Sequence, residues 1–106
     1  MTVSVTRISP AELQNLRATL ADTALIDVRE PFEQTAFGKI PGVENIPLGD
    51  LESRLGELPA ERAHPIVLVC QSGGRSLSAA RMLVEKGYTN VYSLDGGTGA
   101  WLGAYR

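Results

Sequence analysis

The sequence predicts an α/β fold, in which a central parallel sheet of roughly five short strands is flanked by helices on both faces. Short apolar stretches alternate along the chain with stretches of helical period, as in strands joined by helical crossovers. Residues 65–69 are apolar at every position, which is typical of a strand buried on both faces of a parallel sheet. The chain has 106 residues, 43% of them hydrophobic, enough for one compact domain and too few for two. We therefore expect a single domain over residues 1–106.

Four strands are predicted from short apolar stretches, over residues 2–7, 24–28, 65–69 and 90–94. The first alternates Val3 and Val5 with polar residues, a pattern typical of an edge strand. Residues 32–47 contain two glycines and two prolines, which is too much turn chemistry for a long helix. We predict a structured crossover there, whose apolar side chains are available for a short strand or for core contacts: Ile40, Val43 and Ile46.

Three helices are predicted between these strands. Ser9 and Glu12 have the spacing of a capping box, and a helix is expected from there to about Leu20, with Leu13, Leu16 and Leu20 facing the core. An amphipathic helix is expected over 49–58, ended by Pro59. The third helix is expected over 76–86, followed by Gly87 at the position of a C-terminal capping glycine. Residues 95–99 are expected to form a glycine-rich turn, and Trp101 to cover the core.

Composition excludes several classes of function. The formal charge is −2, and the basic residues are dispersed, so we expect no nucleic-acid partner and no membrane partner. No apolar run approaches the roughly 18 residues of a membrane span, and no signal peptide is evident, so we expect a cytoplasmic protein. One cysteine allows no internal disulfide and no resolving thiol. One histidine and one cysteine assemble no zinc site, and we expect neither a metal nor a cofactor.

The stretch Cys70-Gln71-Ser72-Gly73-Gly74-Arg75-Ser76 joins the strand over 65–69 to the third helix. Its cysteine lies at the carboxyl end of a strand, the edge of an open α/β sheet at which ligands bind. The two glycines permit a nest of inward-facing amides, and a helix N-terminus adds about half a positive charge. These groups and the Arg75 guanidinium favour a thiolate, which lowers the pKa of Cys70 below the usual value of about 8.5. Cys70 is therefore a candidate nucleophile, although a lone buried cysteine can also act as a small hydrophobic side chain.

Two further features lie at carboxyl ends of predicted strands. We favour Asp27 as a hydrogen-bond anchor for the cysteine loop over a role as a base, because a stabilised thiolate needs no proton acceptor. Arg29 either forms an ion pair with Glu30 or Glu33 or contacts the substrate, and we favour the ion pair. The glycine-rich turn over 95–99 either lines the same pocket or reflects backbone geometry alone, and we favour the second interpretation.

These residues resemble the rhodanese domain of single-domain sulfurtransferases. Cys70, Gly73, Arg75 and Ser76 match the family's Cys-x-x-Gly-x-Arg loop followed by Ser or Thr. Four further strings fall in the family's order and spacing over nearly the whole chain: residues 26–30, 38–42, 45–47, and 94–97 with Trp101. Lys39 stands where family members usually have His. The resemblance implies the rhodanese arrangement of the α/β fold.

The resemblance also implies a reaction. Cys70 would attack the sulfane sulfur of a donor such as thiosulfate and release sulfite, leaving a cysteine persulfide. Amides from Gln71 through Ser76 would stabilise the outer sulfur, and Arg75 would draw in the anionic donor or brace the loop. The sulfur would pass to cyanide, a small thiol, a thioredoxin-like protein or a sulfur-acceptor protein.

Two alternatives to this enzyme remain open from the sequence. One is a persulfide carrier or a binding module that serves a specific protein partner. The other is a small phosphatase or arsenate reductase, because related folds hold a tetrahedral oxyanion in a Cys-to-Arg loop. Those loops are one residue longer than this one, which has four residues between Cys70 and Arg75. The shorter loop favours a sulfur atom over a phosphate.

Overall fold

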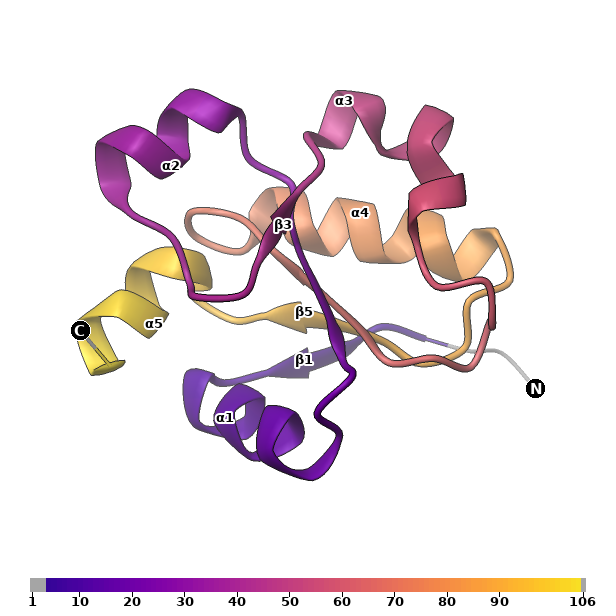
Figure 1. Cartoon of the computed structure of the whole chain (residues 1–106), viewed down its shortest axis with the longest axis horizontal. Coiled ribbons are helices and arrows are strands. Elements are labelled where there is room, and N and C mark those ends of the chain that lie inside the picture. Colours follow the sequence, from indigo (N-terminus) through magenta and orange to yellow (C-terminus); the bar gives the residue numbers. More distant parts are fainter. Residues whose placement is uncertain (1–3, 106) are drawn as a thin grey trace.

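A five-stranded parallel sheet with the strand order β1-β5-β4-β2-β3 forms the centre of the computed structural model, which describes residues 4–105 (Figure 1). Its strands are β1 (Thr6–Ile8), β2 (Ala24–Asp27), β3 (Glu44–Asn45), β4 (Ile66–Val69) and β5 (Val91–Leu94). All neighbouring strands pair in parallel. The predicted fold class is therefore confirmed, and three of the four predicted strands agree with the structure to within one residue at each end.

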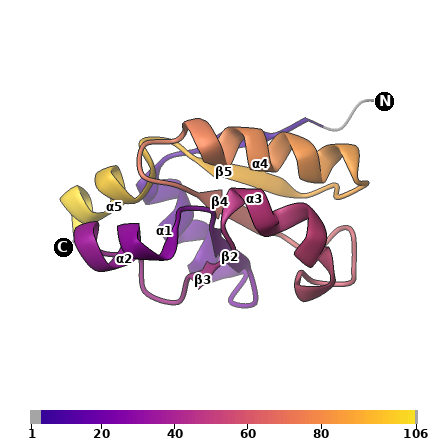
Figure 2. The same cartoon turned by 90° about the horizontal axis from the view of Figure 1, so that it is seen from above.

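Helices cover both faces of the sheet (Figures 1 and 2). They are α1 (Pro10–Thr19), α2 (Pro31–Phe37), α3 (Leu48–Leu51), the 3₁₀ helix η1 (Glu52–Glu57), α4 (Gly74–Glu85) and α5 (Gly97–Tyr105). Alternate side chains of β4 enter two separate cores. Leu68 packs in the core beneath α3, η1 and α4, whereas Val67 packs in the core beneath α1 and α5. Every residue of β4 is fully buried, as its apolar sequence predicts.

The first strand is shorter than predicted. Residues 2 and 3 of the predicted strand over 2–7 lie outside the described residues, and β1 runs from Thr6 to Ile8. Val5 precedes the strand and packs, partly buried, against the core. Helix α1 has the predicted capping box, in which Ser9 Oγ accepts from the amide of Glu12 and the Glu12 carboxylate accepts from the amide of Ser9. Leu20 is 40% exposed, contrary to prediction, because the helix ends at Thr19 and Leu20, its C-cap, has non-helical dihedral angles and leaves the apolar stripe.

The predicted crossover over 32–47 contains a short helix, α2, and a short strand, β3. The glycines and prolines of this stretch hide both elements from a sequence-based prediction. Helix α2 begins at Pro31, one residue before the predicted crossover, and continues into it as far as Phe37, with a capping box formed by Glu30 and Glu33. Gly38, with φ of +86°, ends this helix. The short edge strand β3 follows, and the apolar side chains of Ile40 and Ile46 make core contacts outside it. The predicted helix over 49–58 is instead α3 followed by η1, with a kink at Arg54.

Helix α5 was not predicted, and the glycine-rich turn expected over 95–99 is only partly a turn, because residues 97–99 form the first turn of this helix. Three glycines in its nine residues, at 97, 99 and 103, disfavour a helix by intrinsic propensity. Tertiary packing overrides that preference, because Trp101 is buried in the core beneath α1 and α5. Trp101 therefore covers the core as predicted, from within a helix. No helix in residues 4–105 has both the length and the apolar character needed to cross a membrane.

Candidate active site

The candidate nucleophile lies where β4 ends and the loop leading to α4 begins. The Cys70 residue is only 1% exposed, so its sulfur lies at the bottom of the loop. The chain then turns back through Gly73, whose φ of +118° is a conformation that favours glycine. This turn directs the Gly73 amide to the sulfur, with 3.0 Å between nitrogen and Sγ. Helix α4 begins at Gly74, two residues earlier than predicted, so Arg75 and Ser76 belong to its first turn.

The surroundings of the sulfur favour a thiolate. Burial raises the pKa of the Cys70 thiol, but the hydrogen bond with the Ser76 hydroxyl and those from the amides of Ser76, Gly73 and Ser72 lower it by more, so the net shift is downward. The Ser76 hydroxyl lies 3.6 Å from Sγ and 2.9 Å from the hydroxyl of Ser93 on β5. Both serines are buried. The loop is thus built to hold a sulfur anion with neutral donors.

The second glycine-rich turn contacts the back of the same loop. The amide of Thr98 donates to the carbonyl oxygen of Cys70 at 2.8 Å, and the amide of Gly99 donates to that of Gln71 at 3.2 Å. A Cβ atom on Gly97 would lie 2.5 Å from the Cys70 carbonyl oxygen, so only glycine fits there. The favoured interpretation, backbone geometry alone, is therefore incomplete. The amides of Thr98 and Gly99 bind carbonyl groups of the Cys70 loop, and the amide of Gly73 in that loop faces the sulfur.

Asp27 and Arg29 form a buried ion pair beneath the loop. Both side chains are fully buried, and Arg29 Nη2 lies 2.8 Å from Asp27 Oδ2. The Arg29 guanidinium also donates to Gln71 Oε1 and to the carbonyl oxygen of Gly38, each at 2.8 Å. Asp27 therefore reaches the loop through Arg29 and makes no direct hydrogen bond to it among the described residues.

The predicted partner of Arg29 is wrong. Arg29 does form an ion pair, but with the carboxylate of Asp27 and not with that of Glu30 or Glu33. Asp27 Oδ1 also accepts from the backbone amide of Arg29 at 3.0 Å, so the local turn at the end of β2 brings the two side chains together. The contact with Glu33 involves only its carbonyl oxygen, at 3.5 Å. The full burial of Arg29 also argues against direct contact with a substrate.

Glu33 pairs with Arg75, a partner that the sequence interpretation did not predict. Its carboxylate accepts from both terminal nitrogens of Arg75, at 2.8 and 2.7 Å, and from the amide of Glu30 at 2.8 Å. The hydrogen bond from Arg75 lowers the pKa of Glu33 to about 2, and the Glu30 amide also lowers it, although burial opposes both. The capping-box spacing after Pro31 was the available signal. It predicts a helix start but not a partner 42 residues away.

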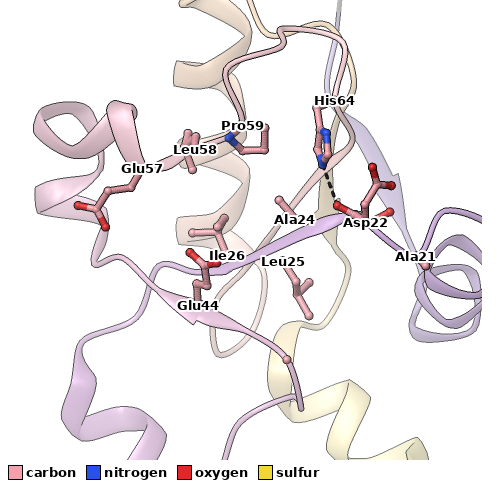
Figure 3. Close-up of a pocket in the computed structure, with 12 residues that line it drawn as sticks. Ala21, Asp22, Ala24, Leu25, Ile26, Glu44, Glu57, Leu58, Pro59 and His64 are labelled. Carbon is pink, nitrogen blue, oxygen red and sulfur yellow. Dashed lines mark hydrogen bonds between the residues drawn. The ribbon is translucent and has the colours of Figure 1, made fainter.

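A cavity of about 430 Å³ lies at the opposite edge of the sheet, where β2 begins (Figure 3). Asp22, Glu44 and Glu57 contribute carboxylates to its lining, and His64 Nε2 lies 2.7 Å from the carbonyl oxygen of Asp22. No cluster of side chains in residues 4–105 has an arrangement suited to a metal ion. This cavity contains no nucleophilic thiol, and we place the candidate active site at the Cys70 loop.

Comparison with known proteins finds one family and several relatives that match most of this chain. The family described as "Rhodanese-like domain" matches residues 9–104. A protein named "Sulfurtransferase" from Allochromatium vinosum is 36% identical, over 92% of this chain and 88% of the relative. A "Thiosulfate sulfurtransferase GlpE" from Pseudomonas aeruginosa is 34% identical, over 93% and 86%. The structure of the human single-domain sulfurtransferase TSTD1 superimposes with a TM-score of 0.84 at 32% identity, covering 97% of this chain and all of that one.

Proposed function

The chain belongs to the rhodanese-like sulfurtransferase family, and from this premise we propose that it transfers a sulfane sulfur from thiosulfate, or a related donor, to a thiophilic acceptor. Cys70 carries the sulfur as a persulfide between the two steps. Thiosulfate as the donor is supported by relatives of 34–40% identity that are named thiosulfate sulfurtransferases.

The observation that carries this proposal is the Gly73 amide 3.0 Å from Cys70 Sγ, in a loop whose other amides also lower the pKa of the thiol. A thiolate is the form of cysteine that attacks sulfur. The same donors suit the persulfide that follows, because its outer sulfur is also anionic and the amides need no rearrangement to stabilise it.

The two steps balance without a cofactor. In the first, the Cys70 thiolate forms a bond to the outer sulfur of thiosulfate, the sulfur–sulfur bond of thiosulfate breaks, and sulfite leaves with the electron pair. In the second, an acceptor attacks the outer sulfur of the persulfide and the Cys70 thiolate leaves. With cyanide as the acceptor, the product is thiocyanate. The chain has one cysteine, so no second thiol of its own can take the sulfur.

Mass spectrometry of the intact protein tests this proposal. After incubation with thiosulfate without a reducing agent, the protein is expected to gain about 32 Da, the mass of one sulfur atom. Addition of cyanide should remove that mass and release thiocyanate. Cys70→Ser is the control and should show neither change. A wild-type protein that gains no mass would contradict the proposal.

The physiological acceptor is proposed from chemistry alone, as a small thiol, a thioredoxin-like protein or another sulfur-acceptor protein, in the cytoplasm. A thiol that must stay reduced suits a reducing compartment. If the protein acts chiefly as a carrier, cyanide and small thiols should remove the persulfide sulfur far more slowly than its protein partner does. Decay of the added 32 Da or so with each acceptor in turn distinguishes the carrier from the free-standing enzyme.

A further inference from the structure

The Arg75 guanidinium is the cation that an anionic donor would meet at the loop, and it is already paired. Each of its two terminal nitrogens donates to one oxygen of the Glu33 carboxylate, a bidentate arrangement that fixes the plane of the guanidinium. Glu33 is itself almost fully buried and is held in place by the Glu30 amide. The positive charge at the loop is therefore opposed by a carboxylate that cannot easily move away.

We propose that Glu33 is a specificity-determining residue, which neutralises Arg75 and biases the site toward sulfur donors that carry at most one negative charge. This inference rests on the proposed sulfurtransferase function. It assigns a role to a side chain outside the loop and names the donor class as thiosulfonates and organic persulfides in preference to inorganic thiosulfate.

The charges around the loop support this assignment. Arg75 is neutralised by Glu33, and Arg29 is neutralised by Asp27 beneath the loop. Arg7 and Asp95, which line a cavity of about 280 Å³ beside the loop, form a third pair. These three pairs leave no net positive side chain among the described charged residues that contact the loop or line that cavity. Stabilisation of an anion then depends on the loop amides and the N-terminus of α4, which act over a short range.

The number of charges brought together differs among donors. When the Cys70 thiolate meets thiosulfate, three negative charges gather, and the reaction yields a persulfide anion and the sulfite dianion. With methanethiosulfonate, two negative charges gather. The thiolate bonds to the terminal sulfur, the sulfur–sulfur bond breaks, and methanesulfinate leaves with the electron pair. With a protonated organic persulfide, only the charge of the thiolate is present, and the leaving thiolate carries it away. A neutral site penalises these donors in that order.

The pairing with Glu33 does not block Arg75. The bidentate contact uses one hydrogen of each terminal nitrogen, and the side chain of Arg75 is 41% exposed. A guanidinium has five N–H donors, so three remain to meet a donor's oxygen atoms. Glu33 thus orients the remaining N–H groups of Arg75 while it cancels the net charge. The proposal therefore predicts a shift in preference among sulfur donors and not an inactive protein.

The test compares two donors of similar shape and different charge. Thiosulfate and methanethiosulfonate differ by one oxygen anion replaced with a methyl group. The ratio of their kcat/KM values reports on the charge at the site and cancels changes in thiolate fraction, which affect both donors equally. Glu33→Gln keeps the shape and removes the charge. It should raise kcat/KM about tenfold for thiosulfate and about threefold for methanethiosulfonate, so the ratio rises about threefold. Salt should reduce this gain.

Two further variants provide the controls. Glu61→Gln removes the same charge from an exposed position that makes no side-chain contact among the described residues, and should leave the ratio unchanged. The double variant Glu33→Gln with Arg75→Gln restores a neutral pair of positions and should return the ratio to that of the wild type. Arg75→Gln alone leaves the carboxylate unopposed and should lower the ratio about threefold, which supplies a second test if Glu33→Gln folds poorly.

The outcomes separate this inference from the proposed function. If the wild type forms a persulfide but the ratio does not rise in Glu33→Gln, or does not fall in Arg75→Gln, the specificity role is wrong and the sulfurtransferase stands. A purely structural Glu33 would reduce kcat/KM equally for both donors. If neither donor gives a persulfide in the wild type, the proposed function itself fails.

Discussion

The amide of Thr98 donates a hydrogen bond to the carbonyl oxygen of Cys70, at 2.8 Å, and thereby joins two segments that are separate in the sequence. Each segment follows a strand, β4 or β5, and these strands are neighbours in the sheet. The carboxyl ends of parallel neighbours meet at one edge, so the second glycine-rich turn packs on the first. The reactive loop is therefore braced from behind by the start of α5.

Gly97→Ala is expected to damage this brace. Its Cβ atom would lie 2.5 Å from the Cys70 carbonyl oxygen, and the backbone has φ of +61°, so the loop or the helix must shift. We expect a loss of about 2 kcal/mol or more in the free energy of unfolding, measured by urea denaturation. Gly103→Ala is the matched control. Nothing lies within 4 Å of its added Cβ atom, and it should stabilise α5 by about 0.5–1 kcal/mol. Equal effects of the two substitutions would contradict this account.

Ser76→Ala should weaken the thiolate. The Ser76 hydroxyl lies 3.6 Å from the sulfur and is the strongest of the hydrogen-bonding groups that lower the pKa of Cys70, so its loss should raise that pKa. The pH dependence of the rate of alkylation by iodoacetamide measures the change. At neutral pH we also expect about a tenfold slower formation of the persulfide from thiosulfate. Ser78→Ala, on the exposed side of α4, should leave both quantities unchanged.

The pair of Glu33 and Arg75 predicts a dependence of stability on pH. The pKa of Glu33 is lowered from 4.5 to about 2, chiefly by its hydrogen bonds with Arg75, so the folded state favours the ionised carboxylate. The stabilisation is fully present above pH 4.5 and is lost as pH falls toward 2. Because Arg75 is partly exposed, we expect only about 1–2 kcal/mol. Glu33→Gln should therefore show a flatter decline in unfolding free energy over this range, and an unchanged slope would contradict the pairing.

Asp27→Asn should be the most destabilising of these substitutions. Asp27 and Arg29 are both fully buried, so removal of the carboxylate leaves a buried guanidinium without its counter-charge. The expected loss is about 3–5 kcal/mol in the free energy of unfolding. Asp95→Asn removes a carboxylate from the exposed pair with Arg7 and should cost less than about 1 kcal/mol. Chemical denaturation of the two variants measures the contrast.

Hydrolysis of an aryl phosphate is not expected. The loop has four residues between Cys70 and Arg75, and Arg75 is held by Glu33 instead of standing free to receive a dianionic phosphate. Turnover of para-nitrophenyl phosphate by the wild type should not exceed that of Cys70→Ser. Turnover above that background would revive the phosphatase alternative.

Much of the fold could be predicted from local sequence. The fully apolar stretch ending at Val69 places β4 in the centre of the sheet, because a strand with two apolar faces must be covered on both. The position of Cys70 after this strand follows directly. The paired glycines at 73 and 74 predict a turn because glycine adopts conformations closed to other residues, and Gly73 has φ of +118° in the structure. Helix α5 was missed because its glycines oppose helix formation locally and burial of Trp101 compensates for them.

By itself, the sequence determined the α/β class, the place of Cys70 at a strand's carboxyl end, and the amide-rich turn around its sulfur. These depend on short-range patterns of apolar residues and glycines. Only the tertiary structure decided that Glu33 holds Arg75, that Arg29 connects Asp27 to Gln71, and that Thr98 braces Cys70. Glu33 and Arg75 lie 42 residues apart, as do Arg29 and Gln71. Their meeting depends on the path of the crossover and the order of the strands, which bring distant carboxyl ends to one edge of the sheet.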